Sequence, residues 1–232
     1  MQIPLELKLP VRAELEDFIA RNSDEITTAA KQVVDSSRHE FLYIWSAQRS
    51  GKTHLLSALC SMAEKSEQTV IYLPMQQAND LSPEIFEGLE TADIICIDDI
   101  DMIAGNPDWE QALFNLYNRL RDSHRKLVVT SHASPASIPI SLPDLKSRLA
   151  WGITLGIASL SDSDKKHILQ LRAKNIGMEL SDEAVSYLLN HFSRDLASLI
   201  KILDKLENAS LIEKRKVTIP FLKDQLGKFQ PL

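Results

Sequence analysis

Five short, largely apolar runs in the first two thirds of the chain constrain its fold more than any other feature. Helical patterns and loops separate these runs. Short apolar runs of this kind are typical of strands that are buried on both faces of a sheet. Strands that alternate with helices build a parallel sheet between two layers of helices. The expected strands are 41–45, 70–73, 94–98, 127–130 and 153–157.

The segments between the runs predict the helices that cover the sheet. Leu55, Leu56 and Leu59 recur at helical spacing after the first run. Two further helices are expected, at 83–89 and 109–122. Residues 132–144 carry three prolines and predict a loop.

The last third of the chain carries mainly helical patterns and no further apolar run. Ser161, followed three residues later by Asp164, begins the first helix with the spacing of a capping box. Three more helices are expected after it. The expected domains are an extended N-terminal peptide at 1–10, an α/β core at 11–157 and a small all-α domain at 158–232.

Composition excludes several classes of protein. With 26 Lys and Arg against 32 Asp and Glu, the net charge of −6 disfavours a basic domain that binds duplex DNA. The two cysteines, Cys60 and Cys96, lie in apolar stretches, which is typical of buried thiols in a reducing compartment. No apolar stretch reaches the ~18 residues of a membrane span, and the N-terminus lacks a signal-peptide pattern. We expect a cytoplasmic protein with no membrane partner.

Residues 46–53 read Ser-Ala-Gln-Arg-Ser-Gly-Lys-Thr, between an expected strand and an expected helix. This is a phosphate-binding loop in which Ser46 replaces the first glycine. Serine adopts a positive φ less readily than glycine, so the tightness of the loop is an open question. Backbone N–H groups at the helix start hold the phosphates, Lys52 reaches the terminal ones and Thr53 offers its hydroxyl to Mg²⁺. The expected nucleotide-binding residues are Ser50, Gly51, Lys52, Thr53 and His54.

Polar side chains end the third and fourth expected strands. Asp98 follows four apolar residues, the place of the acid that holds Mg²⁺ in P-loop NTPases. Asp99 is a candidate to polarise an attacking water. Thr130 and Ser131 stand where a polar residue senses the γ-phosphate in P-loop ATPases with an extra strand. The pattern does not choose between these two.

Two arginines are candidates for charge stabilisation. Arg148, between the proline-rich loop and the fifth expected strand, faces away from its own chain's nucleotide. It can serve a neighbour's transition state as an arginine finger, and a surface salt bridge is the alternative. Arg194 begins a helix, where the helix dipole disfavours a cation. We expect Arg194 to reach back to the nucleotide phosphates.

The N-terminal segment from Gln2 to Leu9 alternates apolar and other residues, and Pro4 favours an extended backbone. An amphipathic extended peptide suits an apolar groove on a partner protein. An edge strand of the chain's own sheet and a frayed tail are the alternatives.

Together these residues resemble the AAA+ clade of the bacterial replication initiator DnaA, and within it the DnaA-homologous regulators, over essentially the whole chain. The most specific likeness is that of 145–152 to the arginine-finger box of the initiator. The Walker A, Walker B, first-sensor and second-sensor likenesses lie at Gly51-Lys52-Thr53-His54, Ile97-Asp98-Asp99-Ile100, Thr130-Ser131 and Arg194-Asp195-Leu196.

This resemblance implies an AAA+ P-loop NTPase fold, with a five-stranded parallel sheet between helices and a small all-α lid domain. It also implies that the cofactor is ADP or ATP with Mg²⁺. Residues 16–22 resemble the segment that lies by the adenine, so Phe18 and Ile19 are expected at the nucleotide.

The function implied is negative regulation of replication initiation. A protein of this kind docks on the DNA-loaded sliding clamp, the β subunit of DNA polymerase III, and presents Arg148 to ATP-bound DnaA. Hydrolysis then leaves inactive ADP–DnaA, and DNA is contacted only through the clamp. The residues that resemble a clamp-binding peptide are Gln2, Ile3, Leu5 and Leu7.

A self-oligomerising AAA+ ATPase, such as a helicase loader, is the alternative function. The intact Lys52, Thr53, Asp98 and Asp99 allow it, and a homo-oligomer stays open. We expect an ATPase-activating regulator more than a strong ATPase, and turnover by the chain alone separates the two. A DNA-binding repressor is disfavoured by the net charge and by the expected lack of a helix-turn-helix domain.

Overall fold

The computed structural model describes residues 13–36, 40–47, 50–192, 196–213 and 219–228. The chain divides into two compact units, of which the first ends at Ser159 and the second begins at Leu160. Within the described residues, no helix has the length and apolar character needed to cross a lipid bilayer.

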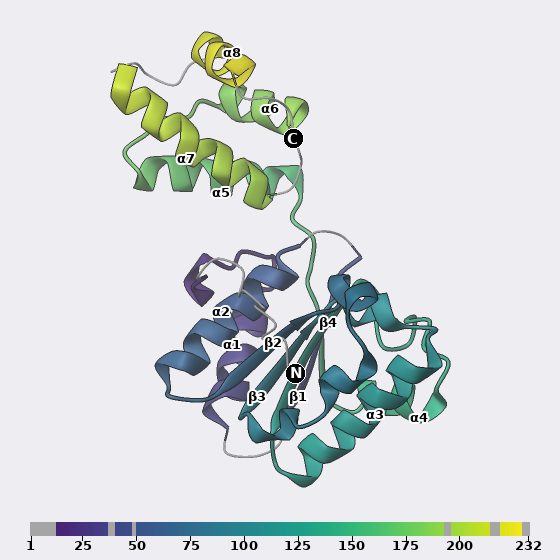
Figure 1. Cartoon of the computed structure of the whole chain (residues 1–232). Helices are drawn as coiled ribbons and strands as arrows, with labels where there is room; N and C mark the ends of the chain where they lie inside the picture. Colours follow the sequence, from purple (N-terminus) through teal and green to yellow (C-terminus); the bar gives the residue numbers. More distant parts are fainter. Residues whose placement is uncertain (1–12, 37–39, 48–49, 193–195, 214–218, 229–232) are drawn as a thin grey trace. The chain divides into compact units, whose positions relative to one another are not determined.

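The first unit is built on a parallel sheet (Figure 1). Its five strands have the order β2-β3-β4-β1-β5. All five predicted strands are confirmed to within one residue at either end. β4 lies between β3 and β1 and is therefore the expected extra strand. It separates the phosphate-binding loop, which follows β1, from the acidic pair Asp98 and Asp99 at the end of β3. The strands are β1 (Phe41–Trp45), β2 (Val70–Pro74), β3 (Ile94–Asp98), β4 (Lys126–Ser131) and β5 (Ile153–Gly156).

Helices cover both faces of this sheet, α1 and α2 on one side and α3 and α4 on the other (Figure 1). Alternate residues of a strand point to opposite faces, so Leu42 and Ile44 of β1 enter one apolar core, while Phe41 and Tyr43 enter the other. The helices are α1 (Ser23–Asp35), α2 (Lys52–Lys65), α3 (Pro107–Asp122) and α4 (Pro143–Leu149).

The cysteines belong to the core, as predicted. Cys60 on α2 and Cys96 on β3 are free and fully buried. Hydrogen bonding with Cys60, together with burial, raises the pKa of the Cys96 thiol, which makes it a poor nucleophile.

Two local predictions were wrong. The helix expected at 83–89 is instead a pair of 3₁₀ turns, Pro83–Phe86 and Leu89–Thr91, because Gly88 between them has a left-handed φ of 74°. The loop expected at 132–144 ends earlier, since α4 begins at Pro143, a residue well suited to the first turn of a helix. Three more 3₁₀ turns occur at Leu15–Asp17, Met75–Asp80 and Ile100–Ile103.

The second unit is a small helical domain with its own apolar core. The capping box at its start is confirmed, because Ser161 Oγ accepts the N–H of Asp164 and Asp164 Oδ2 accepts the N–H of Ser161. Leucines from four helices, together with Phe221, fill the core. The helices are α5 (Asp162–Asn175), α6 (Asp182–His191), α7 (Leu196–Glu213) and α8 (Ile219–Lys228).

Candidate functional site

The predicted phosphate-binding loop lies between β1 and α2, at the carboxyl end of the sheet. Gly51 caps α2 with a φ of 87°, a left-handed backbone that glycine adopts without strain. Ser46 is not among the described non-glycine residues with a positive φ, which are Glu67, Asp99 and His124. The replacement of the first glycine by serine therefore introduces no left-handed strain at this position.

Lys52 is a buried cation at the start of α2, with only 5% of its surface exposed. Its Nζ donates to the carbonyl of Ser46 at 3.4 Å and lies 4.0 Å from Asp99 Oδ1. Burial lowers the pKa of Lys52, although the charges of Asp99, Asp98 and Asp101 oppose this shift. An ammonium held this loosely by its nearest carboxylate is well placed to receive anionic ligand oxygens.

Asp98, at the end of β3, is the centre of a hydroxyl network. Its Oδ2 accepts from Thr53 Oγ1 at 2.7 Å and from Tyr72 Oη at 2.9 Å, while its Oδ1 accepts from Thr130 Oγ1. Burial and the neighbouring Asp98 raise the pKa of Tyr72, so this phenol remains a donor. Thr53 and Asp98 are thus in direct contact, and their oxygens are the hard ligands that Mg²⁺ prefers.

Asp99 has a left-handed backbone, with φ 55° and ψ 55°, which is uncommon outside glycine. Its N–H donates to Thr130 Oγ1 at 2.9 Å, and Gln76 Nε2 donates to its Oδ2 at 2.8 Å. Strained residues of this kind cluster at functional sites, held there by their surroundings.

The hydroxyls of Thr130 and Ser131 point to different surroundings. Thr130 Oγ1 joins Asp98 to the backbone of Asp99, as described above. Ser131 Oγ accepts the N–H of Ala133 at 3.1 Å, in the turn that follows β4. Of the two hydroxyls, that of Thr130 is therefore the one that contacts Asp98 and Asp99.

A second acidic group borders this network. His132 Nδ1 lies 3.0 Å from Asp101 Oδ2 and 3.6 Å from Asp99 Oδ1. Burial raises the pKa of Asp101, but hydrogen bonds from the backbone and ring of His132 outweigh this and lower it overall. Neither residue was predicted from the sequence, because Asp101 and His132 are far apart in the chain and no local pattern indicates that they meet.

Three buried polar atoms at this end of the sheet have no hydrogen-bond partner among the described residues. They are Ser50 Oγ, His54 Nε2 and Asp99 Oδ1. Buried polar atoms are nearly always hydrogen-bonded, so such a group needs an explanation. A nucleotide with its cation fits, because Ser50 and His54 flank the start of α2 and Asp99 faces Lys52.

Phe18, expected beside the adenine, is buried and lies directly against the phosphate-binding loop. A methyl group added at Gly51 would lie 3.4 Å from Phe18 Cε2. Ile19 is partly buried beside it. The remaining predicted site residues, Arg194 and the N-terminal Gln2, Ile3, Leu5 and Leu7, lie outside the described residues.

Arg148 occupies the last turn of α4 and contacts aromatic rings. Its Cζ lies 4.5 Å from the ring centroid of Trp151 and 5.9 Å from that of Tyr117. In the described part of the chain no carboxylate pairs with it, so the alternative of a surface salt bridge has no support there.

Glu110 anchors the segment that leads into α4. It is 1% exposed, and its carboxylate accepts the N–H groups of Gly105, Ser141 and Leu142 at 2.6 to 3.1 Å. The sequence analysis missed this residue, because a glutamate in the first turn of α3 looks like an ordinary favourable charge at a helix start.

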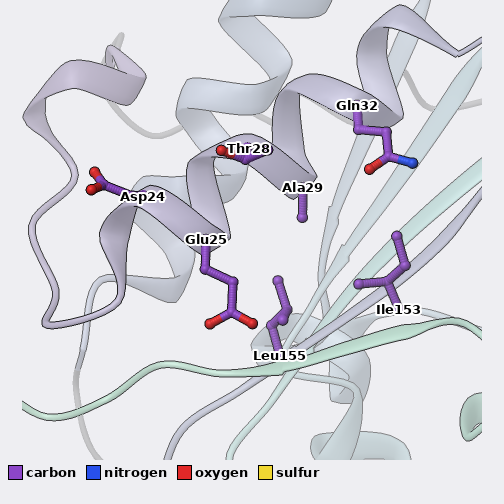
Figure 2. Close-up of a pocket in the computed structure, with 7 residues that line it drawn as sticks. All are labelled: Asp24, Glu25, Thr28, Ala29, Gln32, Ile153 and Leu155. Atoms are coloured by element: carbon purple, nitrogen blue, oxygen red, sulfur yellow. The ribbon is translucent and has the colours of Figure 1, made fainter.

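A hollow of about 420 Å³ lies elsewhere, between α1 and the edge strand β5 (Figure 2). None of the predicted site residues lines it. Two carboxylates, Asp24 and Glu25, stand at this hollow and would repel a phosphate. The hollow is therefore a poor candidate for the nucleotide site.

Comparison with known proteins agrees with this arrangement. A family model described as the bacterial DnaA ATPase domain matches residues 9–156, and a model of the Hda lid domain matches residues 162–226. Among solved structures, domain III of the Thermotoga maritima replication initiation protein DnaA has a TM-score of 0.75 at 22% identity, covering 97% of this chain and 100% of that one.

Two further solved structures share the fold. AMPPCP-bound DnaA from Aquifex aeolicus has a TM-score of 0.69 at 24% identity, covering 84% of this chain and 66% of that one. The Thermotoga maritima RuvB branch migration motor has a TM-score of 0.64 at 15% identity, covering 94% and 72%. At these identities the structural likenesses show the AAA+ fold alone.

Proposed function

Because this chain belongs to the family of the bacterial DnaA ATPase domain, we propose that it is a negative regulator of replication initiation that stimulates hydrolysis of DnaA-bound ATP. The observation that carries the proposal is the setting of Arg148. This cation contacts two aromatic rings and pairs with no carboxylate among the residues that the structure describes. The match of the second unit to the lid of Hda supports a regulator over an initiator.

The chain binds an adenine nucleotide of its own in this proposal, ADP or ATP with Mg²⁺. Lys52 and the loop N–H groups hold the phosphates, and Thr53 and Asp98 hold the cation. The buried oxygen and nitrogen atoms of Ser50 and His54 support this, since a nucleotide would give them partners. The AMPPCP bound by the Aquifex aeolicus DnaA is a supporting analogy.

Arg148 supplies charge to the ATP of DnaA, in trans. An arginine adds positive charge where the transferred phosphoryl group becomes more negative, and in other P-loop systems such a residue is worth ~10³–10⁵ in rate. The N-terminal residues Gln2, Ile3, Leu5 and Leu7 bring the chain to the DNA-loaded sliding clamp. The product, ADP–DnaA, is inactive in initiation.

The test is hydrolysis of DnaA-bound ATP in the presence of clamp-loaded DNA. We expect Arg148→Ala to lower the stimulated rate at least about 10³-fold, towards that of DnaA alone. Gln2→Ala should lower only that part of the stimulated hydrolysis rate that depends on the clamp. Lys146→Ala, which removes a cation two residues away on the same helix, is the matched control. Full stimulation by the Arg148→Ala protein would overturn the proposal.

A self-oligomerising ATPase is the second candidate, and the arrangement around Asp99 favours it. Asp99 Oδ1 is buried without a described hydrogen-bond partner and lies 4.0 Å from Lys52 Nζ, where a general base for hydrolysis would stand. Multiple turnover of ATP by the chain alone, abolished by Asp99→Asn and indifferent to clamp and DnaA, would establish this function instead.

A further inference from the structure

Trp151 is exposed to an unusual degree for its size. Three large apolar side chains are exposed in the described part of the chain, Met102 and Leu171 at 53% and Trp151 at 68%. Tryptophan side chains are highly buried on average, because their rings carry a large apolar surface. Instead its indole covers the guanidinium of Arg148, at 4.5 Å from Cζ to the ring centroid.

The backbone around Trp151 is held firmly. Its N–H donates to the carbonyl of Arg148 at 3.1 Å, in the turn that ends α4. Gly152 follows, packed so closely on β1 that a methyl group there would lie 2.2 Å from the carbonyl oxygen of Phe41. The indole is therefore carried by a backbone that has little freedom to move away from Arg148.

Tyr117 lies on the other element that contacts Arg148. Its ring is buried, 5.9 Å from Arg148 Cζ, and packs edge-to-face on Phe41 at 5.4 Å between centroids. Phe41 thus supports Tyr117 through its ring and limits Gly152 through its carbonyl oxygen. One strand residue steadies both aromatic contacts of Arg148.

Contact with aromatic rings differs chemically from an ion pair. A ring attracts the flat face of a guanidinium, whereas the five N–H donors lie in its plane and point outward from its edge. A carboxylate would occupy those donors, and a ring over the face leaves them available. Arg148 therefore keeps its edge donors for an incoming planar or tetrahedral anion.

We propose that Trp151, with Tyr117 behind it, is the positioning residue that holds Arg148 by its face and presents its edge to a phosphate of a nucleotide bound to a partner protein. This inference rests on the proposed function for the identity of that partner. The partner protein also covers the exposed indole when it binds. Tryptophan, tyrosine and arginine are enriched in this way at the centres of protein interfaces.

The first test uses the stimulated hydrolysis of DnaA-bound ATP at saturating concentrations of the full chain. We expect Trp151→Leu to lower the maximal rate about 3- to 30-fold, the range of a cation–π contact, and Trp151→Phe to retain most of it. Leu171→Ala, which removes an exposed apolar side chain from α5, is the control and should change nothing. Thermal unfolding confirms that each variant is folded.

A double variant separates positioning from simple adhesion. If Trp151 acts through Arg148, then Trp151→Leu adds no further loss in the Arg148→Ala background. A further loss in that background, or a Trp151→Leu protein with the wild-type maximal rate, overturns the proposal.

The second test needs no partner and so separates this inference from the proposed function. The fluorescence of wild type minus that of Trp151→Phe isolates the emission of Trp151. We expect Arg148→Ala to increase quenching by neutral acrylamide, because the ring is uncovered, and to reduce quenching by iodide relative to acrylamide, because the cation is gone. Lys146→Ala should do neither.

Unchanged acrylamide quenching in Arg148→Ala overturns the stack of the Trp151 indole on the Arg148 guanidinium, even if DnaA is stimulated. The expected change with no stimulation by wild type supports the stack and rejects the proposed function alone.

Discussion

Lys52 and Arg148 are both cations assigned to nucleotide phosphates, yet the molecule holds them in opposite ways. Lys52 is buried among carboxylates at the ends of β1 and β3, and its desolvation lowers its pKa. Arg148 lies at the end of a short helix, is only partly buried and contacts two aromatic rings. The two sites differ in dielectric surroundings, in chemical partners and in exposure.

In the proposed function, the difference follows from whose ligand each cation serves. A ligand enclosed by its own chain can be met by a buried charge, because low local dielectric strengthens each contact. A ligand carried by another protein must be reached from the surface, where a long side chain is costly to order. Aromatic contacts lower that cost by restricting Arg148 before the partner arrives.

The largest loss of folding stability is expected at Glu110, which supports the segment that leads to Arg148. Glu110→Ala removes the buried carboxylate that accepts the N–H groups of Gly105, Ser141 and Leu142, which should lower the free energy of unfolding by about 3 kcal/mol. Glu110→Gln keeps one acceptor oxygen and should lose less. Urea unfolding measures both. The contrast sharpens if the alanine variant also loses stimulation of DnaA while it keeps its affinity for ADP.

Removal of the buried cation should act on the chain's own ligand. Lys52→Ala is expected to weaken ADP binding about 10- to 100-fold, the range for hydrogen bonds to charged groups. Arg148→Ala should change this affinity by less than about 2-fold, because its ligand belongs to another protein. Isothermal titration calorimetry measures both constants. Equal losses in the two variants would break the distinction drawn above.

A smaller effect is expected from the hydroxyl that joins the two acids. Thr130→Val keeps the shape of the side chain but removes its donation to Asp98 and its acceptance from Asp99, so the affinity for Mg²⁺-ATP should fall about 5-fold. Ser131→Ala is the matched control and should bind as wild type does. The reverse order of effects would assign the sensor to Ser131.

The smallest effect is expected from an ordinary ion pair, which gives a third kind of cation for comparison. Arg125 pairs with Asp93, which also accepts the N–H and hydroxyl of Thr69. These hydrogen bonds, chiefly those of Thr69, lower the pKa of Asp93 below its usual 3.8.

A carboxylate with a lowered pKa stabilises the fold above that usual value and loses its contribution as the pH falls through the lowered one. Asp93→Asn should therefore cost under about 1 kcal/mol at pH 7. The difference between variant and wild type should shrink as the pH is lowered below 3.8. Urea unfolding from pH 7 downward checks this, and a difference that is independent of pH would contradict it.

Much of the candidate nucleotide site could be predicted because its signals are local. A phosphate-binding loop needs a strand, a turn with glycine at positive φ and a helix start, which are consecutive in the chain from Phe41 to Lys65. Asp98 could be placed for the same reason, since four apolar residues and an acid mark the carboxyl end of a buried strand. Parallel strands then bring their carboxyl ends to one edge of the sheet.

The residues that surround these motifs could not be found this way. Tyr72 and Gln76 reach Asp98 and Asp99 only because β2 lies beside β3, and sequence distance says nothing of strand order. The choice of Thr130 over Ser131 depends on which of two consecutive side chains faces the acids. That choice follows from the register of β4 against its neighbours.

The sequence by itself determined the alternation of strands and helices, the phosphate-binding loop, the acidic pair and the position of Arg148 in the chain. Those features depend on neighbouring residues, whose spacing sets local backbone structure. Only the tertiary structure decided that Glu110 anchors the start of α4 and that Trp151 and Tyr117 hold the guanidinium of Arg148. These contacts join α3, α4 and β1, and packing brings them together only after each element has formed.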